Sequence, residues 1–338
     1  MLNQAVINLN TIRENAKSVK KKLKKGVKFC AVVKADGYGH GAEKVSSAIY
    51  SIVDSFAVAL VEEGISLRLS GIDKEILVFT PPSKDDVERS VFYRLTHTVT
   101  RAEHLKMLIA EGKKQNVTVK VHLKFNTGMN RYGMDKISEL KSLINLAKNS
   151  SVNICGLYSH FATPENKNSL MCALNKFLLA NNFIKGYNNK VTSHVSASGG
   201  FLSGVQMDMV RIGILLYGYK PFKSNLVSVK PAMKVYAPVL QKRRLYKGDT
   251  ALYGDKAVDR DGIFPLIRYG YADGLDRKEI DGLINNRCMD VSLAVSAKVS
   301  KRGAIVMDNA DILAEKYHTI SYEILTKSAI RAEKIYLT

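Results

Sequence analysis

Eight short apolar stretches, separated by segments of helix length, constrain the fold of this chain more than any other feature. We predict strands over Lys28 to Val33, Ser55 to Leu60, Ile76 to Thr80, Thr96 to Thr100, Val119 to Phe125, Asn153 to Ser159, Val191 to Val195 and Met209 to Ile212. Such alternation is typical of parallel strands covered by helices. Eight units predict an α/β fold, a (β/α)8 TIM-like barrel, whose chemistry follows the C-terminal ends of its strands.

The pattern changes near Pro221, where prolines and short alternating stretches begin. Strands over Ala232 to Leu240, Ile263 to Tyr269 and Val291 to Ala297 predict a mostly β domain. We therefore expect a barrel domain over residues 1–222, whose first few residues are free to pair with the other domain, and a smaller C-terminal β domain over residues 223–338. A chain of 338 residues has room for both.

The cysteines and the N-terminal residues bear on the cellular compartment of the protein. Four cysteines are present, with no CxxC pair: Cys30, Cys155, Cys172 and Cys288. This spacing favours reduced thiols over disulfides or a zinc site, and we expect no metal. Residues 1–4 do not begin a signal peptide, and no apolar run is long enough to span a membrane. We predict a cytoplasmic protein with no membrane partner.

The formal net charge of +20 is compatible with a nucleic-acid partner. Its distribution argues against one, because outside the run Lys20 to Lys25 the basic residues are scattered and not interleaved with aromatic residues. That run follows a capping-box pattern, Thr11 with Glu14, and apolar residues at helical spacing. It predicts the polar face and basic end of an amphipathic helix, and we expect no nucleic-acid partner.

Lys34 is the candidate nucleophile. It directly follows the apolar run Phe29 to Val33, and buried lysines are rare unless they are paired or reactive. Burial favours the neutral amine, which can form a Schiff base with an aldehyde. Tyr38 and three glycines follow, and glycine lets the backbone approach a ligand closely. The alternative is an ordinary strand-end lysine that reaches solvent beside a glycine turn.

The segment Ala31 to Gly41, AVVKADGYGHG, resembles the pyridoxal-phosphate lysine motif of the alanine racemases. The resemblance implies that Lys34 carries pyridoxal 5'-phosphate covalently and that Tyr38 contacts it. Further segments resemble the same family, in the same order, up to about residue 323. Several are weak singly, but their order and completeness make the combination strong.

The segment Lys124 to Gly133 resembles one in which a lysine, often carbamylated, orients an arginine. In this chain the lysine is Lys124 and the arginine is Arg131, which by resemblance faces the cofactor and the substrate carboxylate. A carbamate would turn Lys124 into an anionic acceptor for Arg131. Asn126 stands where the family has an aspartate, so one negative charge is removed.

Three other barrel segments extend the resemblance. His160 matches a histidine that packs on the cofactor ring, and Ser198 matches a phosphate-binding serine. Arg211 matches an arginine that faces the pyridine nitrogen, and the amides of Gly213 and Ile214 are implied to hold the phosphate. Because an arginine keeps its proton, the ring nitrogen stays unprotonated, which favours racemisation over transamination.

The second domain is implied to supply the other acid/base. Tyr253 resembles a tyrosine that acts across the dimer interface, and inversion of a stereocentre needs proton transfer on both faces. Lys34 and Tyr253 would divide that task. The remaining implied residues are Tyr271 at the substrate entrance, Met289, whose backbone amide meets the substrate carboxylate, Asp290, which lies nearby, and Tyr322 near the phosphate.

These features predict an isomerase: a homodimeric alanine racemase with shared active sites, which supplies D-alanine for peptidoglycan of the cell wall. A racemase of another small amino acid, such as serine, stays open because pocket size discriminates weakly. A non-catalytic pyridoxal-phosphate-binding protein and a decarboxylase of the same fold type are disfavoured by Tyr253 and Arg211. Three departures from the family are compatible with a divergent member: Asn126, Ala197 in place of a usual asparagine, and a shortened region from Asp290 to Ile320. In that region the family's usual glycine-aspartate turn and the strand after it are hard to find.

Overall fold

The computed structural model describes residues 2–253, 257–274, 277, 285–294 and 298–338. The chain forms two compact units. The barrel unit comprises Arg13–Ala35 and Ala42–Val229, and the second unit comprises Met1–Ile12, Asp36–Gly41 and Lys230–Thr338. The predicted domain boundary between residues 222 and 223 stays a prediction, since domains and compact units need not end at the same residue.

All eight predicted barrel strands are present. They are β2 (Lys28–Val32), β3 (Ser55–Val58), β4 (Ile76–Val78), β5 (Thr96–Val99), β6 (Val119–Lys124), β7 (Val152–Tyr158), β8 (Thr192–His194) and β9 (Met209–Ile212). They form one parallel sheet in the order β8-β7-β6-β5-β4-β3-β2-β9. Backbone bonds of 3.0 Å from Asp208 to Ser193 and from Arg211 to Ser196 connect the two edges. The predicted barrel is therefore confirmed, nearly closed.

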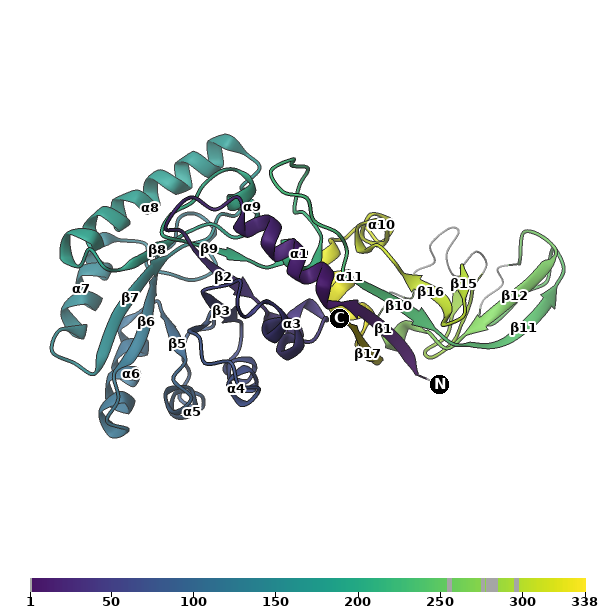
Figure 1. The fold of residues 1–338 in the computed structure, drawn as a ribbon, viewed down its shortest axis with the longest axis horizontal. Coiled ribbons are helices and arrows are strands. Elements are labelled where there is room, and N and C mark those ends of the chain that lie inside the picture. The colour runs from purple at the N-terminus through teal and green to yellow at the C-terminus, as the bar shows by residue number, and fades with distance from the viewer. Residues whose placement is uncertain (1, 254–256, 275–276, 278–284, 295–297) are drawn as a thin grey trace. The chain divides into compact units, whose positions relative to one another are not determined.

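Helices cover the outside of this sheet (Figure 1). They are α1 (Leu9–Lys20), α3 (Ala42–Ile49), α4 (Val61–Leu69), α5 (Val87–Phe92), α6 (Ala102–Lys114), α7 (Ile137–Ala147) and α8 (Lys167–Tyr187), with the short α9 (Ser198–Leu202) and η1 (Ile214–Tyr217) at strand ends. No helix in the described part of the chain is both long and apolar enough to cross a bilayer.

The start predicted for the first helix is wrong. The helix begins at Leu9, and the Asn8 side chain accepts a hydrogen bond from the amide of Thr11 at 2.9 Å. Asn8 therefore caps the helix, and Thr11 lies inside it. The helix ends at Lys20, so most of the basic run to Lys25 lies beyond it.

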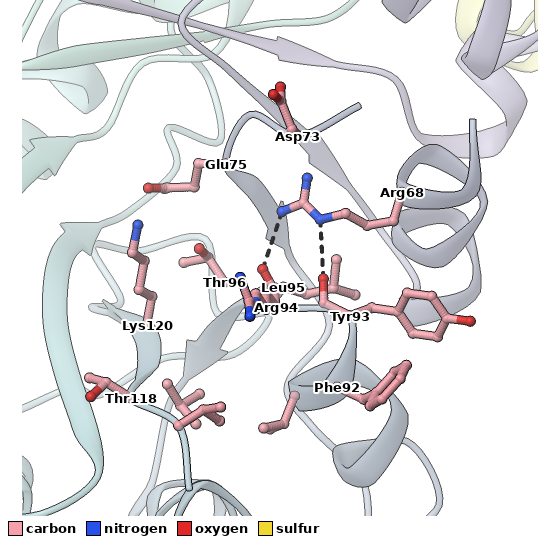
Figure 2. A pocket seen from close by; sticks show the side chains of 13 residues that line it. Arg68, Asp73, Glu75, Phe92, Tyr93, Arg94, Leu95, Thr96, Thr118 and Lys120 are labelled. Carbon is pink, nitrogen blue, oxygen red and sulfur yellow. Dashed lines mark hydrogen bonds between the residues drawn. The ribbon is translucent and has the colours of Figure 1, made fainter. Parts of the chain in front are cut away.

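The N-terminal end of the barrel holds a pocket of about 700 Å³, bordered by the starts of β4, β5 and β6 (Figure 2). The Arg68 guanidinium donates to the carbonyls of Ile72 and Lys74, each at 2.6 Å, and to those of Tyr93 and Arg94 at 3.1 and 3.2 Å. It thereby ties the loop before β4 to the loop before β5. A role in stability is expected at this end of a barrel.

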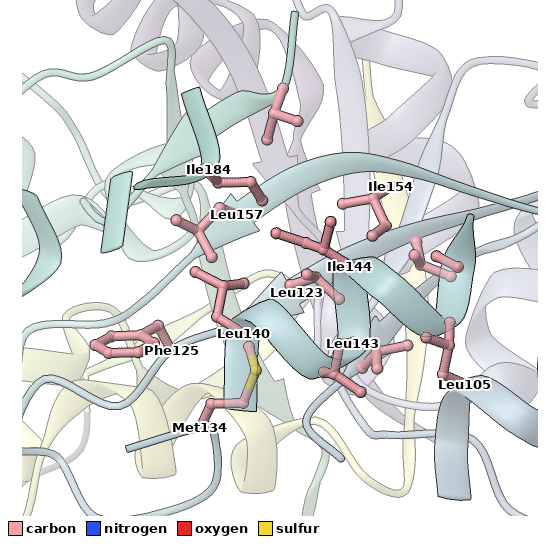
Figure 3. Packing of buried hydrophobic residues seen from close by; sticks show 14 of the residues in the cluster. Leu105, Leu123, Phe125, Met134, Leu140, Leu143, Ile144, Ile154, Leu157 and Ile184 are labelled. Atoms are coloured by element: carbon pink, nitrogen blue, oxygen red, sulfur yellow. The ribbon is translucent and has the colours of Figure 1, made fainter. Parts of the chain in front are cut away.

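A layer of apolar side chains packs between the strands and the outer helices (Figure 3). Leu123 and Leu157, on neighbouring strands, belong to the same buried cluster as Leu140 and Ile144 of α7. Burial of such a side chain contributes about 1.5–3 kcal/mol relative to exposure. The layer gives the strand ends a rigid support.

The second unit contains two sheets. The first has the order β15 (Val299–Ser300), β16 (Gly303–Met307), β10 (Met233–Ala237), β1 (Asn3–Asn8) and β17 (Ala332–Leu337), and the second β11 (Val239–Leu245), β12 (Gly262–Ile267), β14 (Ser292–Leu293) and β13 (Asn285–Arg287). Helices α10 (Ala310–Lys316), α11 (Ser321–Ser328) and η2 (Tyr271–Asp273) complete it. The predicted mostly β second domain is confirmed.

Two parts of this unit need comparison with the sequence prediction: the region between Asp290 and Ile320, and the strand predicted over Val291 to Ala297. A strand is present between Asp290 and Ile320, since β16 pairs antiparallel with β10. The sequence pattern, in which this strand is hard to find, therefore did not reveal it. Of the strand predicted over Val291 to Ala297, residues 295–297 lie outside the described residues.

Candidate active site

Lys34 lies where the first barrel strand ends, at the start of the turn α2 (Lys34–Tyr38). The dihedral φ is positive at every residue from 35 to 39 and again at Gly41, so the turn is left-handed. This conformation is costly for residues with a side chain and must be held by contacts. The Ala35 amide donates to Glu63 at 2.5 Å, and a Cβ at Gly39 would lie 2.5 Å from the carbonyl oxygen of Leu325.

The Lys34 ammonium is half-buried, and its environment favours the neutral amine. Burial lowers the pKa of Lys34, the charge of Arg131 lowers it further, and only Glu63 acts in the other direction. The Glu63 carboxylate is itself occupied by the amides of Ala59 and Leu60, at 2.7 and 3.0 Å. A neutral amine is the form that a Schiff base requires.

The Arg211 guanidinium lies in the barrel interior, 2% exposed, and all of its hydrogen-bond acceptors are uncharged. It donates to Nδ1 and the carbonyl oxygen of His194 at 2.6 and 3.1 Å, and to the carbonyls of Ser159 and Val195 at 2.7 and 3.2 Å. It also approaches Nδ1 of His160 at 3.4 Å. Burial lowers the pKa of Arg211 to about 10, so the group is still charged at neutral pH.

His160 is a neutral imidazole in this setting. Burial and the charges of Arg211 and Lys124 hold the pKa of His160 well below its usual range. Because an arginine only donates, Nδ1 of His160 accepts and its proton is placed on Nε2. The ring thus presents a donor on the side away from Arg211.

Lys124 is buried at the end of β6, among aromatic rings. Its Nζ lies 4.4 Å from the ring centroid of Tyr158 and 5.4 Å from that of Tyr132. The Arg131 guanidinium carbon lies 5.2 Å from the same Tyr132 ring. Burial, together with Arg211 and Arg131, holds the pKa of Lys124 well below its usual range.

The chain ends of β8 and β9 meet at a small polar cradle. Ser198 is the first residue of α9 and is buried, and its Oγ accepts a hydrogen bond from the Gly213 amide at 3.3 Å. Ile214 begins η1 directly afterwards. A hydroxyl and backbone amides at helical starts suit an anionic oxygen group.

Asn126 organises the loop that carries Arg131. Its Oδ1 accepts from the amides of Gly128 and Asn130, both at 3.1 Å. Its Nδ2 donates to Oδ1 of Asn130 at 2.9 Å and to Oδ1 of Asp135 at 2.7 Å. The asparagine therefore uses both halves of its amide within this loop.

The other predicted residues belong to the second unit. The rings of Tyr38 and Tyr322 lie 6.0 Å apart, and burial raises the pKa of Tyr322 to about 12. Asp290 accepts from Arg331 at 2.8 Å. Tyr253, Met289 and Tyr271 are exposed by 69%, 53% and 37%.

The sequence prediction omitted Glu63, Tyr158 and His194, which hold the residues that it did include. Tyr158 precedes His160 by two positions and lies near the end of a predicted strand, so the alternation of side chains could have placed both on one face. Glu63 has no comparable signal, since its role depends on the loop that folds over it.

Comparisons with known proteins agree with this geometry. The family model "Alanine racemase, N-terminal domain" matches residues 7–221. The alanine racemase of Streptococcus pyogenes serotype M2 (strain MGAS10270) is 32% identical over 365 aligned positions, covering 98% of this chain and 97% of the relative. The solved alanine racemase of Clostridium difficile 630 is similar with a TM-score of 0.92 and 28% identity, covering 100% of this chain and 96% of that one. The structure of the Clostridium difficile 630 alanine racemase in complex with cycloserine is similar with a TM-score of 0.88 and 27% identity, covering 100% of this chain and 96% of that one.

Proposed function

This chain belongs to the alanine racemase family of pyridoxal-phosphate-dependent isomerases, and from that premise we propose that it interconverts L-alanine and D-alanine through Lys34 and Tyr253. The observation that carries the assignment of Lys34 is its position: a half-buried amine of lowered pKa at the end of the first barrel strand, under the charge of Arg131. Lys34 holds the cofactor and serves one face of the substrate. Tyr253 of a second subunit serves the other.

The donors of the barrel unit fit pyridoxal 5'-phosphate. The Ser198 hydroxyl and the amides of Gly213 and Ile214 would hold the phosphate, and Arg211 would face the ring nitrogen. A hydroxyl and backbone amides suit a phosphate dianion. The uncharged acceptors of Arg211 leave its positive charge to act on the ring nitrogen. When bound, the cofactor withdraws electrons from the substrate and so makes its Cα proton removable.

Proton transfer falls to the protein. A neutral Lys34 amine can take the Cα proton on one face, and the Tyr253 hydroxyl can return one on the opposite face. Arg131 is proposed to bind the substrate carboxylate. His160 is proposed to donate a hydrogen bond from Nε2 to the hydroxyl of Tyr253 of the second subunit. From the second unit, the Met289 amide is proposed to meet the substrate carboxylate, with Asp290 nearby and Tyr271 at the entrance. Tyr38 and Tyr322 are proposed to contact the cofactor.

Lys124 is proposed to be a carbamate. Within the described residues its amine contacts aromatic rings and no carboxylate lies within ion-pair distance. A buried lysine of low pKa is an amine that reacts with carbon dioxide, and the product is an anion. That anion would accept hydrogen bonds from Arg131 and offset a cluster of cations.

A homodimer with shared active sites is proposed because Tyr253 and Met289 are exposed in the single chain. Residues assigned to substrate contacts gain a role when a second subunit covers them. We place the enzyme in the cytoplasm, where it would supply D-alanine for peptidoglycan.

The first experiment measures D-alanine formation from L-alanine by purified protein with added pyridoxal phosphate. Lys34→Ala and Tyr253→Phe should each abolish activity, whereas Tyr246→Phe, at another exposed tyrosine of the second unit, should not. L-Serine and other small amino acids in the same assay define the substrate. A wild type that binds the cofactor and racemises none of them would overturn the proposal in favour of a binding protein.

Mixing the two inactive variants tests the shared site. If subunits exchange at random, half of the dimers are mixed and each has one intact site, so about a quarter of wild-type activity should return. Absence of activity after proven exchange would place Lys34 and Tyr253 of one chain in the same site.

A further inference from the structure

A continuous row of close polar contacts crosses the barrel interior from Arg211 to Glu75. Nη1 of Arg211 lies 2.6 Å from Nδ1 of His194, and Nε2 of His194 lies 2.8 Å from Nδ1 of His122. Nε2 of His122 lies 3.4 Å from Oε1 of Glu75. Arg211, His194 and His122 are at most 2% exposed, while Glu75 borders the pocket at the N-terminal end of the barrel (Figure 2).

The donor at one end dictates the direction of every bond in this row. An arginine only donates, so Nδ1 of His194 accepts. A neutral imidazole carries one proton, which His194 must then hold on Nε2 and donate to Nδ1 of His122. His122 in turn holds its proton on Nε2 and points it at Glu75. The row therefore needs an acceptor at its far end, and Glu75 is that acceptor.

The other arrangement is incompatible with Arg211 in its observed place. If His122 held its proton on Nδ1, it would donate to His194, whose own proton would move to Nδ1 and meet an N–H of Arg211. Two facing donors repel, so the guanidinium would have to shift. A doubly protonated His122 has the same consequence, because it also donates from Nδ1.

Burial and neighbouring charges shift the pKa values of Glu75, His122 and His194. Burial alone would raise the pKa of Glu75, but its hydrogen bond to His122 and the charges of His122, Lys120 and Lys28 lower the pKa overall. Burial lowers the pKa of His122, while Cys155 and Glu75 raise it to about 9. His194 is a poor proton acceptor, since burial and Arg211 hold its pKa well below the usual range. Taken alone, a pKa of about 9 would leave His122 charged at pH 7.5. The hydrogen-bond direction that Arg211 imposes on His194 opposes that charge, and on this geometric ground we assign the neutral form.

The barrel leaves space for this row. A Cβ at Gly156 of β7 would lie 2.4 Å from the His122 ring, so no side chain at 156 is compatible with the ring position. On its other side the row is held by Tyr158, whose ring stacks on His194. Both contacts fix the planes of the imidazoles, and so the direction of their hydrogen bonds.

We propose that Glu75 is a remote positioning residue, which fixes the tautomers of His122 and His194 and thereby holds the Arg211 guanidinium in place for the reaction. This role rests on the proposed function of Arg211 opposite the cofactor ring. Glu75 itself touches neither cofactor nor substrate. It connects the N-terminal end of the barrel to the catalytic end.

The primary test reads the tautomers directly, without activity. Nitrogen-15 NMR of histidine-labelled protein distinguishes the two neutral imidazole forms and the charged one, and only seven histidines need assignment. In wild type at pH 7.5, His122 and His194 should both be neutral with the proton on Nε2. A wild-type His122 that is charged, or protonated on Nδ1, would overturn the proposal whatever the enzyme's substrate.

Three variants complete the test. Glu75→Leu removes the acceptor and should change the His122 signal, lower kcat at least tenfold with little change in KM, and alter the absorbance of the bound cofactor. Glu75→Gln keeps an acceptor oxygen and should retain the wild-type tautomers and most of kcat. Asp73→Asn, on the rim of the same pocket and hydrogen-bonded to Tyr50, should behave as wild type. A Glu75→Leu protein with wild-type spectrum and kcat would sink the proposal; if that variant does not fold, the wild-type spectrum still decides.

Discussion

The Tyr158 ring stacks on the imidazole of His194, with centroids 5.0 Å apart and planes 3° apart. The same ring lies 4.4 Å from Nζ of Lys124 and 5.2 Å from the guanidinium carbon of Arg211. The face of an aromatic ring attracts cations, so one side chain holds two basic residues and a histidine in the barrel interior. Its own hydroxyl bonds with Thr98 at 2.7 Å. Basic groups gathered in this way destabilise one another's charged forms.

Lys124 should relieve this crowding by taking up carbon dioxide. Protein incubated with carbon-13 bicarbonate should show a carbamate NMR signal that is absent from Lys124→Met, because burial and two neighbouring arginine charges favour the reactive neutral amine. Lys120→Met, which removes an exposed lysine of the same strand, should keep the signal. A wild type without a carbamate signal at saturating bicarbonate would show that Lys124 stays a simple amine.

Gly156→Ala should destabilise the protein because the new methyl group would meet the His122 ring at 2.4 Å. Overpacking of a tight interior costs about 1–3 kcal/mol, and urea unfolding measures it. Gly186→Ala is the matched control, since a Cβ there meets nothing within 4 Å and alanine favours the helix. The control should be neutral or more stable by up to about 1 kcal/mol. Equal stability of the two variants would contradict the tight contact at His122.

The barrel could be predicted from sequence because each of its strands is buried on both faces and therefore forms an apolar run. The Met209 to Ile212 strand was predicted to the residue, and the others to within two residues at each end. Two-residue strands such as β15 have no such pattern, because their pairing depends on neighbours brought together by the rest of the sheet. The capping of α1 by Asn8 was missed because a good capping box stood three residues later.

The site was predictable only in part. Lys34 and Arg211 stand in recognisable segments beside strand ends, but the hydrogen bond between His122 and His194 joins residues 72 positions apart. No local pattern encodes such a pair. The requirement for glycine at position 156 also cannot be predicted from the sequence. It follows from the closeness of the His122 ring, which leaves no room for a side chain at Gly156.

His97 should make the protein acid-sensitive. Burial lowers the pKa of His97 to about 4, so between pH 4 and 6.5 the unfolded chain binds a proton that the folded chain does not. Stability contributed by this group is present above pH 6.5 and is lost as the pH falls, by about 1.4 kcal/mol per pH unit within that window. His97→Leu should flatten the dependence in urea titrations at pH 5, 6 and 7. Val99→Ala, on the same strand, should lower stability without changing the slope; an unchanged slope in His97→Leu would refute the assignment.

Asn126→Asp restores the residue usual at this position in the family that the chain resembles, and it should nevertheless weaken this protein. An aspartate would still accept from the amides of Gly128 and Asn130, but it could not donate to Asp135, which lies 2.7 Å from Nδ2. Two carboxyl groups would meet where an amide now donates. Since the loop is partly exposed, we expect a loss of about 1 kcal/mol in stability.

The consequence for activity follows from Arg131, which the same loop carries. A displaced loop should raise KM for alanine several-fold while kcat changes less, because Arg131 is proposed to bind the substrate carboxylate. Adding Asp135→Asn to Asn126→Asp supplies a donor again, so the double variant should regain stability and KM. If Asn126→Asp alone matches wild type in melting temperature and KM, the amide of Asn126 has no role in holding the loop, and the family aspartate and this asparagine are interchangeable.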